Sequence, residues 1–168
     1  DLVHQFGKNG FRLYRLPIPK KGVCVGILGQ NGIGKTTAIK ILAGQMEPNL
    51  GDYENESGWD DVLDYFTGTE LHEHFNSISD NKLSCVLKPQ YVDRLPKIMK
   101  GKIGGILKKI NNSRNFDVII EKLGLKNVLG KQIEKGEISG GELQLVSIAA
   151  ALLKDVDLYF FDEPSSYL

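Results

Sequence analysis

The sequence predicts an α/β fold with a helical middle section. Short apolar runs typical of buried strands, at 22–28, 83–87 and 157–161, alternate with segments whose apolar residues recur at helical spacing. A glycine-rich stretch, 29–34, joins the first of these runs directly to a helical segment. Strand, glycine-rich loop and helix in immediate succession indicate an α/β domain, and 168 residues correspond to about one domain.

The helical segments are recognised by the spacing of their apolar residues and by the glycines that end them. One of them reads as helical twice, with a joint at Gly68, and therefore predicts a helical hairpin. The segments are 37–43 (closed by Gly44), 59–81 (the hairpin), 103–110, 118–123 (closed by Gly124) and 140–154.

Composition is that of an ordinary globular chain and excludes several classes of protein. Lys+Arg 21 balance Asp+Glu 21, so the strongly basic character of a dedicated nucleic-acid binder is absent. No apolar run approaches the roughly 18 residues that span a bilayer, and residues 1–5 do not resemble a signal peptide. Cys24 and Cys85 lie in apolar runs without metal-ligand spacing and are expected to be buried. We therefore expect a cytoplasmic protein without membrane association.

The loop Gly29-Gln-Asn-Gly-Ile-Gly-Lys-Thr36 matches the phosphate-binding pattern GxxxxGK[ST] at every fixed position. Its glycines let successive N–H groups turn toward one anion, Lys35 would reach the β- and γ-phosphates, and the Thr36 hydroxyl would ligate Mg²⁺. A helix opening at Lys35 adds its positive N-terminal end. A plain glycine-rich turn is the alternative, but the flanking strand and helix favour a phosphate-binding loop.

Two further segments carry residue types that nucleotide chemistry needs. The apolar run 158–161 ends in Asp162 and Glu163. Alone, this pattern usually marks a strand end at the surface. Beside a phosphate-binding loop, the first carboxylate belongs near Mg²⁺ and the second can polarise the attacking water. Ser139-Gly-Gly-Glu142 predicts a capping box, and its glycines leave bare N–H groups at a helix start, which suits a second anion.

In order and spacing, these three motifs resemble the ATP-binding cassette (ABC) ATPases, and no guanine-reading NKxD motif is present. Longer runs, among them Lys88-Pro-Gln-Tyr-Val-Asp93 and Phe161-Asp-Glu-Pro-Ser-Ser-Tyr-Leu168, narrow the resemblance to the first nucleotide-binding domain of the ABC subfamily E ATPases. That subfamily is the RNase L inhibitor family of ribosome recycling factors. The resemblance runs from about Phe6 to Leu168. It implies an ABC-type P-loop NTPase fold, with a helix-loop-helix insertion at 59–81 and a helical subdomain at about 91–153.

The resemblance also assigns roles by position. Phe6 and Phe11 would stack on adenine, although packing beneath the first strand is the alternative. Gln90 would contact Mg²⁺ and the attacking water, Asp162 would reach Mg²⁺ through water, and Glu163 would be the general base. The signature residues Ser139, Gly140, Gly141 and Glu142 would contact the γ-phosphate held by a partner cassette. The residues expected to hold the phosphates are Gly29, Gln30, Asn31, Gly32, Ile33, Gly34, Lys35, Thr36 and Thr37.

The implied function is ATP hydrolysis with Mg²⁺ in a site completed by the second nucleotide-binding domain of the same parent chain. In the resembled family, closure around two ATP molecules splits ribosomes, so the expected partners are the small ribosomal subunit and release and initiation factors. We interpret the chain as a fragment, and iron–sulfur clusters are expected only in a part of the parent preceding Asp1. Two alternatives are a transporter cassette, disfavoured by the hairpin at 59–81, and a binding module without turnover, disfavoured by Glu163.

Overall fold

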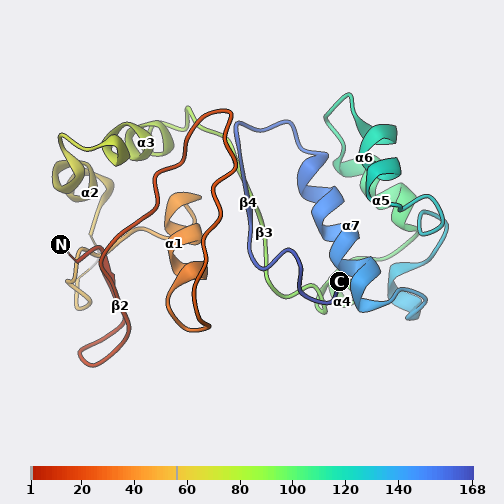
Figure 1. The fold of residues 1–168 in the computed structure, drawn as a ribbon, viewed down its shortest axis with the longest axis horizontal. Helices are drawn as coiled ribbons and strands as arrows, with labels where there is room; N and C mark the ends of the chain where they lie inside the picture. The colour runs from red at the N-terminus through yellow and green to blue at the C-terminus, as the bar shows by residue number, and fades with distance from the viewer. Residues whose placement is uncertain (1, 56) are drawn as a thin grey trace. The chain divides into compact units, whose positions relative to one another are not determined.

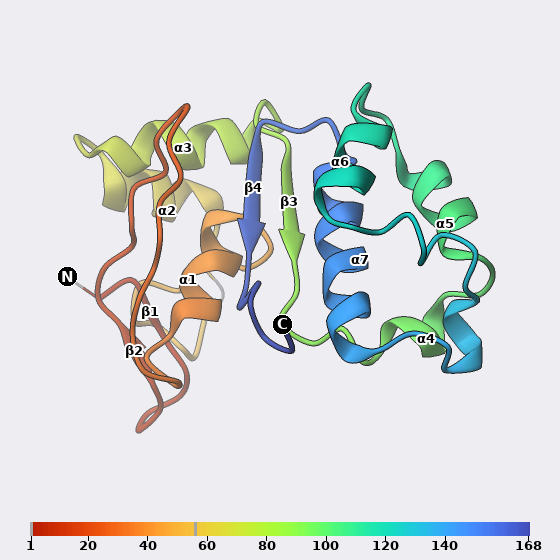
Figure 2. The same ribbon diagram turned by 45° about the vertical axis from the view of Figure 1, so that its right-hand side comes forward.

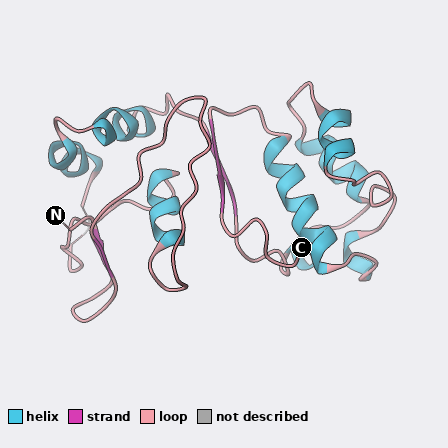
Figure 3. Cartoon of the chain, in the orientation of Figure 1, coloured by secondary structure: helices cyan, strands magenta, loops and turns pink. Residues whose placement is uncertain are grey.

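The computed structural model describes residues 2–55 and 57–168, and the chain divides between Cys85 and Val86 into two compact units (Figure 1). Helices and short strands alternate along the chain (Figure 3), so the α/β prediction is confirmed. In the described part of the chain, no helix combines the length and apolar character needed to cross a bilayer.

The first unit contains a short antiparallel strand pair, a helix that follows the glycine-rich loop, and a helical hairpin (Figure 2). In the strand pair, His4 lies opposite Leu13 and Gln5 opposite Arg12. The elements are β1 (His4–Gln5), β2 (Arg12–Leu13), α1 (Lys35–Leu42), α2 (Trp59–Phe66) and α3 (Glu70–Ser79).

Aromatic packing holds the two helices of the hairpin together. Phe75 of α3 is fully buried, and its ring centroid lies 5.0 Å from that of Phe66 and 6.0 Å from that of Trp59, both on α2. Ring pairs at this spacing add attraction beyond the burial of apolar area. The helix pair expected within 59–81 is therefore present.

The hairpin also contacts the end of α1. Nε2 of His74 lies 2.8 Å from the Leu42 carbonyl oxygen, so this nitrogen carries the proton and donates it. Gly44 has φ +68°, as a helix-closing glycine requires, and a Cβ added there would lie 2.7 Å from Cγ2 of Ile78. Helix α3 thus rests closely on the C-terminal end of α1.

Residues 22–28 do not form the buried strand that their apolar pattern predicts. Val23, Val25 and Leu28 are 61%, 47% and 96% exposed, and the segment belongs to no sheet within the described ranges. Cys24 is exposed, so the expectation that it is buried is wrong. Apolar composition reports a preference for burial, whereas a strand also needs a neighbouring backbone to pair with, which the pattern alone does not reveal.

The second unit combines a two-stranded sheet with a group of helices. The arrows of β3 and β4 point the same way in Figure 2, and both strands begin within two residues of their expected positions. Strand β4 is only half-buried, less than its apolar run suggests. The elements are β3 (Cys85–Lys88), α4 (Leu95–Ile98), α5 (Ile103–Ile110), α6 (Phe116–Lys122), the 3₁₀ turn η1 (Ile133–Lys135), α7 (Gly140–Leu152) and β4 (Leu158–Phe161).

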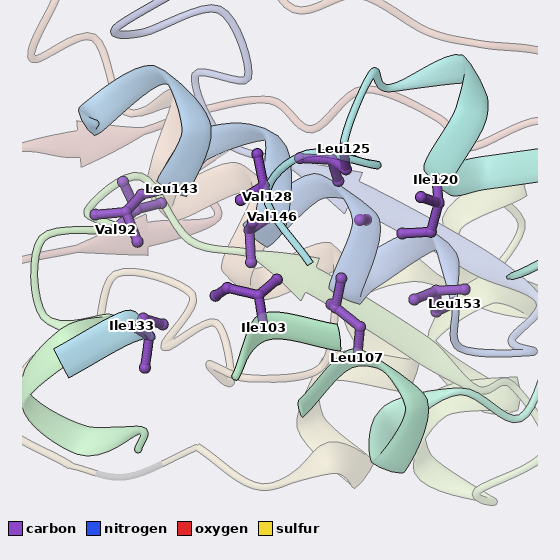
Figure 4. Close-up of a cluster of buried hydrophobic side chains, with 11 residues drawn as sticks. Val92, Ile103, Leu107, Ile120, Leu125, Val128, Ile133, Leu143, Val146 and Leu153 are labelled. Atoms are coloured by element: carbon purple, nitrogen blue, oxygen red, sulfur yellow. The ribbon is translucent and has the colours of Figure 1, made fainter. Parts of the chain in front are cut away.

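One apolar cluster forms the core of the second unit, and α7 runs through it (Figure 4). Ile103 and Leu107 of α5 meet Val146 and Ala149 of α7, and all but Val146 are completely buried. Full burial of each large side chain contributes about 1.5–3 kcal/mol. The core therefore fixes α7, the helix that begins at the signature residues.

We expect the first unit to lose stability as the pH falls below about 6.5, the usual histidine value. Burial lowers the pKa of both His4 and His74. The unfolded chain then takes up protons at a higher pH than the folded chain, so the histidines' contribution is complete well above pH 6.5 and declines as the pH falls toward their folded pKa values. Hydrogen exchange of α3, corrected for intrinsic rates, should show more opening in acid, and His74→Gln should reduce this change. An equal change in both proteins would contradict the assignment.

Candidate nucleotide-binding site

The glycine-rich loop leads into the N-terminus of α1, and Lys35 folds back across it. Its Nζ donates to the main-chain carbonyls of Gly29, at 2.8 Å, and Gln30, at 2.9 Å. Gly32 and Gly34 have φ of +83° and +94°, in the left-handed region that favours glycine. The first turn of α1 carries no acidic residue. An ammonium group and a positive helix end therefore occur together at one loop, as anion binding requires.

Two aromatic rings of the first unit belong to this neighbourhood. A Cβ added to Gly34 would lie 2.2 Å from Cζ of Phe11, so the Phe11 ring lies directly against the loop. The Phe6 ring is 46% exposed, and its centroid is 6.4 Å from that of Phe11. The alternative of packing beneath the first strand loses its premise, because 22–28 is not a strand. The adenine-stacking role of both residues stays a prediction.

In the second unit, the ends of β3 and β4 are tied by two hydrogen bonds between the same two residues. The Asp162 N–H donates to the Lys88 carbonyl at 3.1 Å, and Lys88 Nζ donates to the Asp162 carbonyl at 3.0 Å. Both residues are almost completely buried. Burial lowers the pKa of Lys88, and the carboxylates of Asp162 and Glu163 oppose that shift. Gln90 follows Lys88 by two residues, so the predicted metal ligands Gln90 and Asp162 emerge from neighbouring strand ends.

Glu163, the predicted general base, is held at both its carbonyl and its carboxylate. Its φ of +44° is unusual for a residue with a side chain. Its carbonyl accepts from the Ser166 N–H at 3.2 Å and from Nε2 of Gln144 at 2.8 Å. Its Oε2 accepts from the Ser166 hydroxyl at 3.1 Å. Contacts within the chain therefore orient both the main chain and the carboxylate of Glu163.

The signature residues form the capping box predicted from the sequence. Ser139 Oγ accepts from the Glu142 N–H at 3.2 Å, and Glu142 Oε2 accepts from the Ser139 N–H at 2.9 Å. Lys131 Nζ donates to both Glu142 oxygens, at 2.7 and 2.9 Å, and this contact, with the Ser139 N–H, lowers the pKa of Glu142. A Cβ on Gly141 would lie 2.9 Å from the Tyr167 carbonyl oxygen, so glycine also permits a close approach here.

Three residues near these groups have no role in the prediction made from the sequence: Lys88, Gln144 and Ser166. Gln144 carried a detectable signal, because it is a polar residue between Leu143 and Leu145 in a strongly apolar helix. Lys88 ends an apolar run within the motif quoted for the resemblance. For Ser166 we find no signal in the sequence. Phe6, Phe11 and residues 29–37 belong to the first unit, whereas the Gln90, signature and Asp162-Glu163 residues belong to the second.

The ABC transporter family matches residues 18–166. An uncharacterized ABC transporter ATP-binding protein of Methanocaldococcus jannaschii is 53% identical over 167 residues, which are 99% of this chain and 27% of that protein. The translation initiation factor rli1 of Schizosaccharomyces pombe is 43% identical over 171 residues, covering 100% of this chain and 28% of that protein.

A solved structure is also similar to this chain in fold and sequence. The crystal structure of an archaeal ribosome recycling factor in complex with the archaeal ribosomal stalk protein matches with a TM-score of 0.93 and 51% identity, over 100% of this chain and 32% of that one. The resemblance to ABC subfamily E proteins inferred from the motifs is thereby confirmed. The chain spans less than a third of the length of each of these relatives.

Gly34→Ala is expected to destabilise the loop and the start of α1 by about 2 kcal/mol or more. A side chain in the left-handed region costs roughly 1–2 kcal/mol, and the contact with Phe11 adds overpacking of about 1–3 kcal/mol. Hydrogen exchange of α1 measures the effect. Gly26→Ala is the matched control, because Gly26 has open space around its Cβ position and no left-handed φ. Adding Phe11→Ala should restore only the steric part. Equal exchange in Gly34→Ala and Gly26→Ala would contradict the argument.

Proposed function

The chain belongs to the ABC transporter family, and on this premise we propose that it binds ATP and Mg²⁺ and supplies one half of a composite site for ATP hydrolysis. The observation that carries the proposal is the conformation of the loop 29–36 at the N-terminus of α1. The Lys35 side chain lies across the loop, and Gly32 and Gly34 adopt the left-handed backbone conformation. This arrangement favours a polyphosphate over a singly charged anion, because its N–H groups and ammonium are spread along the loop.

Residues 29–37 would hold the phosphates, and Thr36, Gln90 and Asp162 would hold Mg²⁺. A hydroxyl, an amide oxygen and a carboxylate are oxygen donors, the type that Mg²⁺ prefers beside substrate phosphates. When bound, the ion would supply charge stabilisation as the γ-phosphate bond breaks. The exposed ring of Phe6 and the Phe11 ring beside the loop would receive the adenine base.

Glu163 would accept a proton from the water that attacks the γ-phosphate. Its carboxylate already accepts one hydrogen bond, from Ser166, and its main chain is held at the carbonyl. A base fixed in this way loses little freedom when the reaction occurs. Gln90, from the adjacent strand end, would orient the same water.

The signature residues Ser139, Gly140, Gly141 and Glu142 would contact the γ-phosphate bound by the second nucleotide-binding domain of the parent chain. The support is the N-terminus of a thirteen-residue helix whose first turn contains two glycines. Residues 1–168 would then be a partial ABC domain, with 59–81 as its helix-loop-helix insertion and about 91–153 as its helical subdomain.

For the parent protein we propose a role in translation, in which ATP-driven closure of two cassettes splits ribosomes. The S. pombe relative is named a translation initiation factor, and the archaeal relative is a ribosome recycling factor crystallised with a ribosomal stalk protein. The proposed partners are the small ribosomal subunit, contacted by the hairpin at 59–81, and release and initiation factors, all in the cytoplasm. Iron–sulfur clusters would belong to a part of the parent outside this chain.

Glu163→Gln in the parent protein should leave ATP binding intact and lower the turnover of this site by about 10²–10⁴-fold, the usual contribution of a general base. Lys35→Ala should instead weaken ATP binding, because it removes the ammonium from the loop. ATP affinity and steady-state hydrolysis, measured for both variants beside the unaltered protein, separate the two roles. Unchanged turnover in Glu163→Gln would remove Glu163 from the reaction.

The hairpin should be needed for docking to the ribosome but not for binding ATP. Co-sedimentation of the parent protein with small ribosomal subunits, with and without a non-hydrolysable ATP analogue, tests this. A variant with Tyr65→Ser and Glu73→Ala, at two exposed positions of the hairpin, keeps the buried Phe66–Phe75 contact and should sediment less. Sedimentation equal to that of the unaltered protein would contradict this docking surface. A matched double substitution on α6, Val118→Ser and Lys122→Ala, is the control.

A further inference from the structure

Gln144 is a buried polar residue that the proposed reaction leaves unexplained. It lies on α7 with no exposed surface, between apolar residues that pack into the core of the second unit. Its Nε2 donates to the Glu163 carbonyl at 2.8 Å, and this carbonyl partner fixes which end of the amide is the nitrogen. Its Oε1 is buried and has no hydrogen-bond partner among the described residues.

This arrangement is poor for stability. A buried acceptor without a partner is destabilising, and an apolar side chain of similar volume at position 144 would avoid that penalty. Leu143 and Leu145 show that the helix accommodates such side chains here. A leucine or methionine at position 144 could not donate the hydrogen bond to the Glu163 carbonyl. Because this hydrogen bond is what glutamine adds, it needs a functional explanation.

The bond acts on a main chain that needs support. Glu163 has φ +44°, in the left-handed region that side chains disfavour, and such a conformation persists only where its surroundings hold it. Two donors reach its carbonyl: the Ser166 N–H within the same turn, and Gln144 from a different element. Of these two donors, only Gln144 belongs to a helix packed in the core, so it ties the Glu163 carbonyl to α7.

We propose that Gln144 is a positioning residue through which helix α7 holds the proposed general base Glu163 in its reactive orientation. The proposal rests on the proposed function, because it takes Glu163 as the base. Gln144 lies five residues, about 7.5 Å of helix, from the capping residue Ser139. A movement of the signature end of α7 therefore reaches the Glu163 main chain through one side chain, without passing through the γ-phosphate site itself.

Gln144→Met in the full parent protein tests the proposal, because methionine keeps the volume and removes the donor. Turnover should fall by up to about a hundredfold at this site, as expected for a displaced catalytic group. The KM for ATP should stay unchanged, and the thermal midpoint should not fall. Hydrogen exchange of the peptide covering 162–167 should become faster without nucleotide. Leu143→Met, also buried on α7 but without a bond to Glu163, is the matched control and should change none of these.

Glu163→Gln shows how much turnover is lost when the proposed base itself is removed. It also separates the proposed function from the positioning role of Gln144. If Glu163→Gln retains full turnover, the proposed function fails. If it loses turnover while Gln144→Met retains it, only the positioning role fails. The double variant should be no slower than Glu163→Gln, because Gln144 acts through that residue, and a further decrease would overturn the proposal. A fall in the thermal midpoint together with a raised KM, or a variant that does not fold, would also overturn it and make Gln144 a structural residue.

Discussion

The pair of hydrogen bonds between Lys88 and Asp162 is the constraint on which the second unit's chemistry depends. The two bonds join the ends of β3 and β4, and both partners are almost completely buried. A buried ammonium is costly unless it is paired, and here a carbonyl and two nearby carboxylates compensate it. Because Gln90 and Glu163 each follow within two residues of this junction, a shift at Lys88 would move both proposed catalytic residues together.

Helix α7 connects the signature residues, the apolar core and Glu163, which follows the Lys88–Asp162 junction. Its N-terminus presents the signature residues, its middle packs in the core, and Gln144 reaches Glu163. A glutamate in the first turn is an odd neighbour for a phosphate, yet Lys131 binds both Glu142 oxygens and offsets the charge. This ion pair is about a third exposed, so its effect on stability is modest. Its consequence is electrostatic, since Lys131 offsets a negative charge that would oppose the proposed anion at this helix end.

The sequence predicted local geometry well and pairing poorly, for a physical reason. The capping box at Ser139, the helix-closing Gly44 and the two hairpin helices depend on neighbouring residues in the chain, which the pattern contains. The strand at 22–28 depends on a partner backbone, and Val23 and Leu28 are exposed instead of buried. Gln144, Lys88 and Ser166 act through contacts 19, 74 and 3 residues away. Only the fold reveals the two long-range contacts, and the pattern around Glu163 did not distinguish Ser166.

In the first unit, helix α1 joins the phosphate-binding loop to the helical hairpin. The phosphate-binding loop lies at its N-terminus, and His74 of the hairpin donates to the Leu42 carbonyl at its C-terminus. Eight helical residues span about 12 Å, so the two ends of α1 lie about that far apart. Gly44 and Ile78 pack closely beside that C-terminal end, so the hairpin and the phosphate-binding loop are attached to opposite ends of one helix.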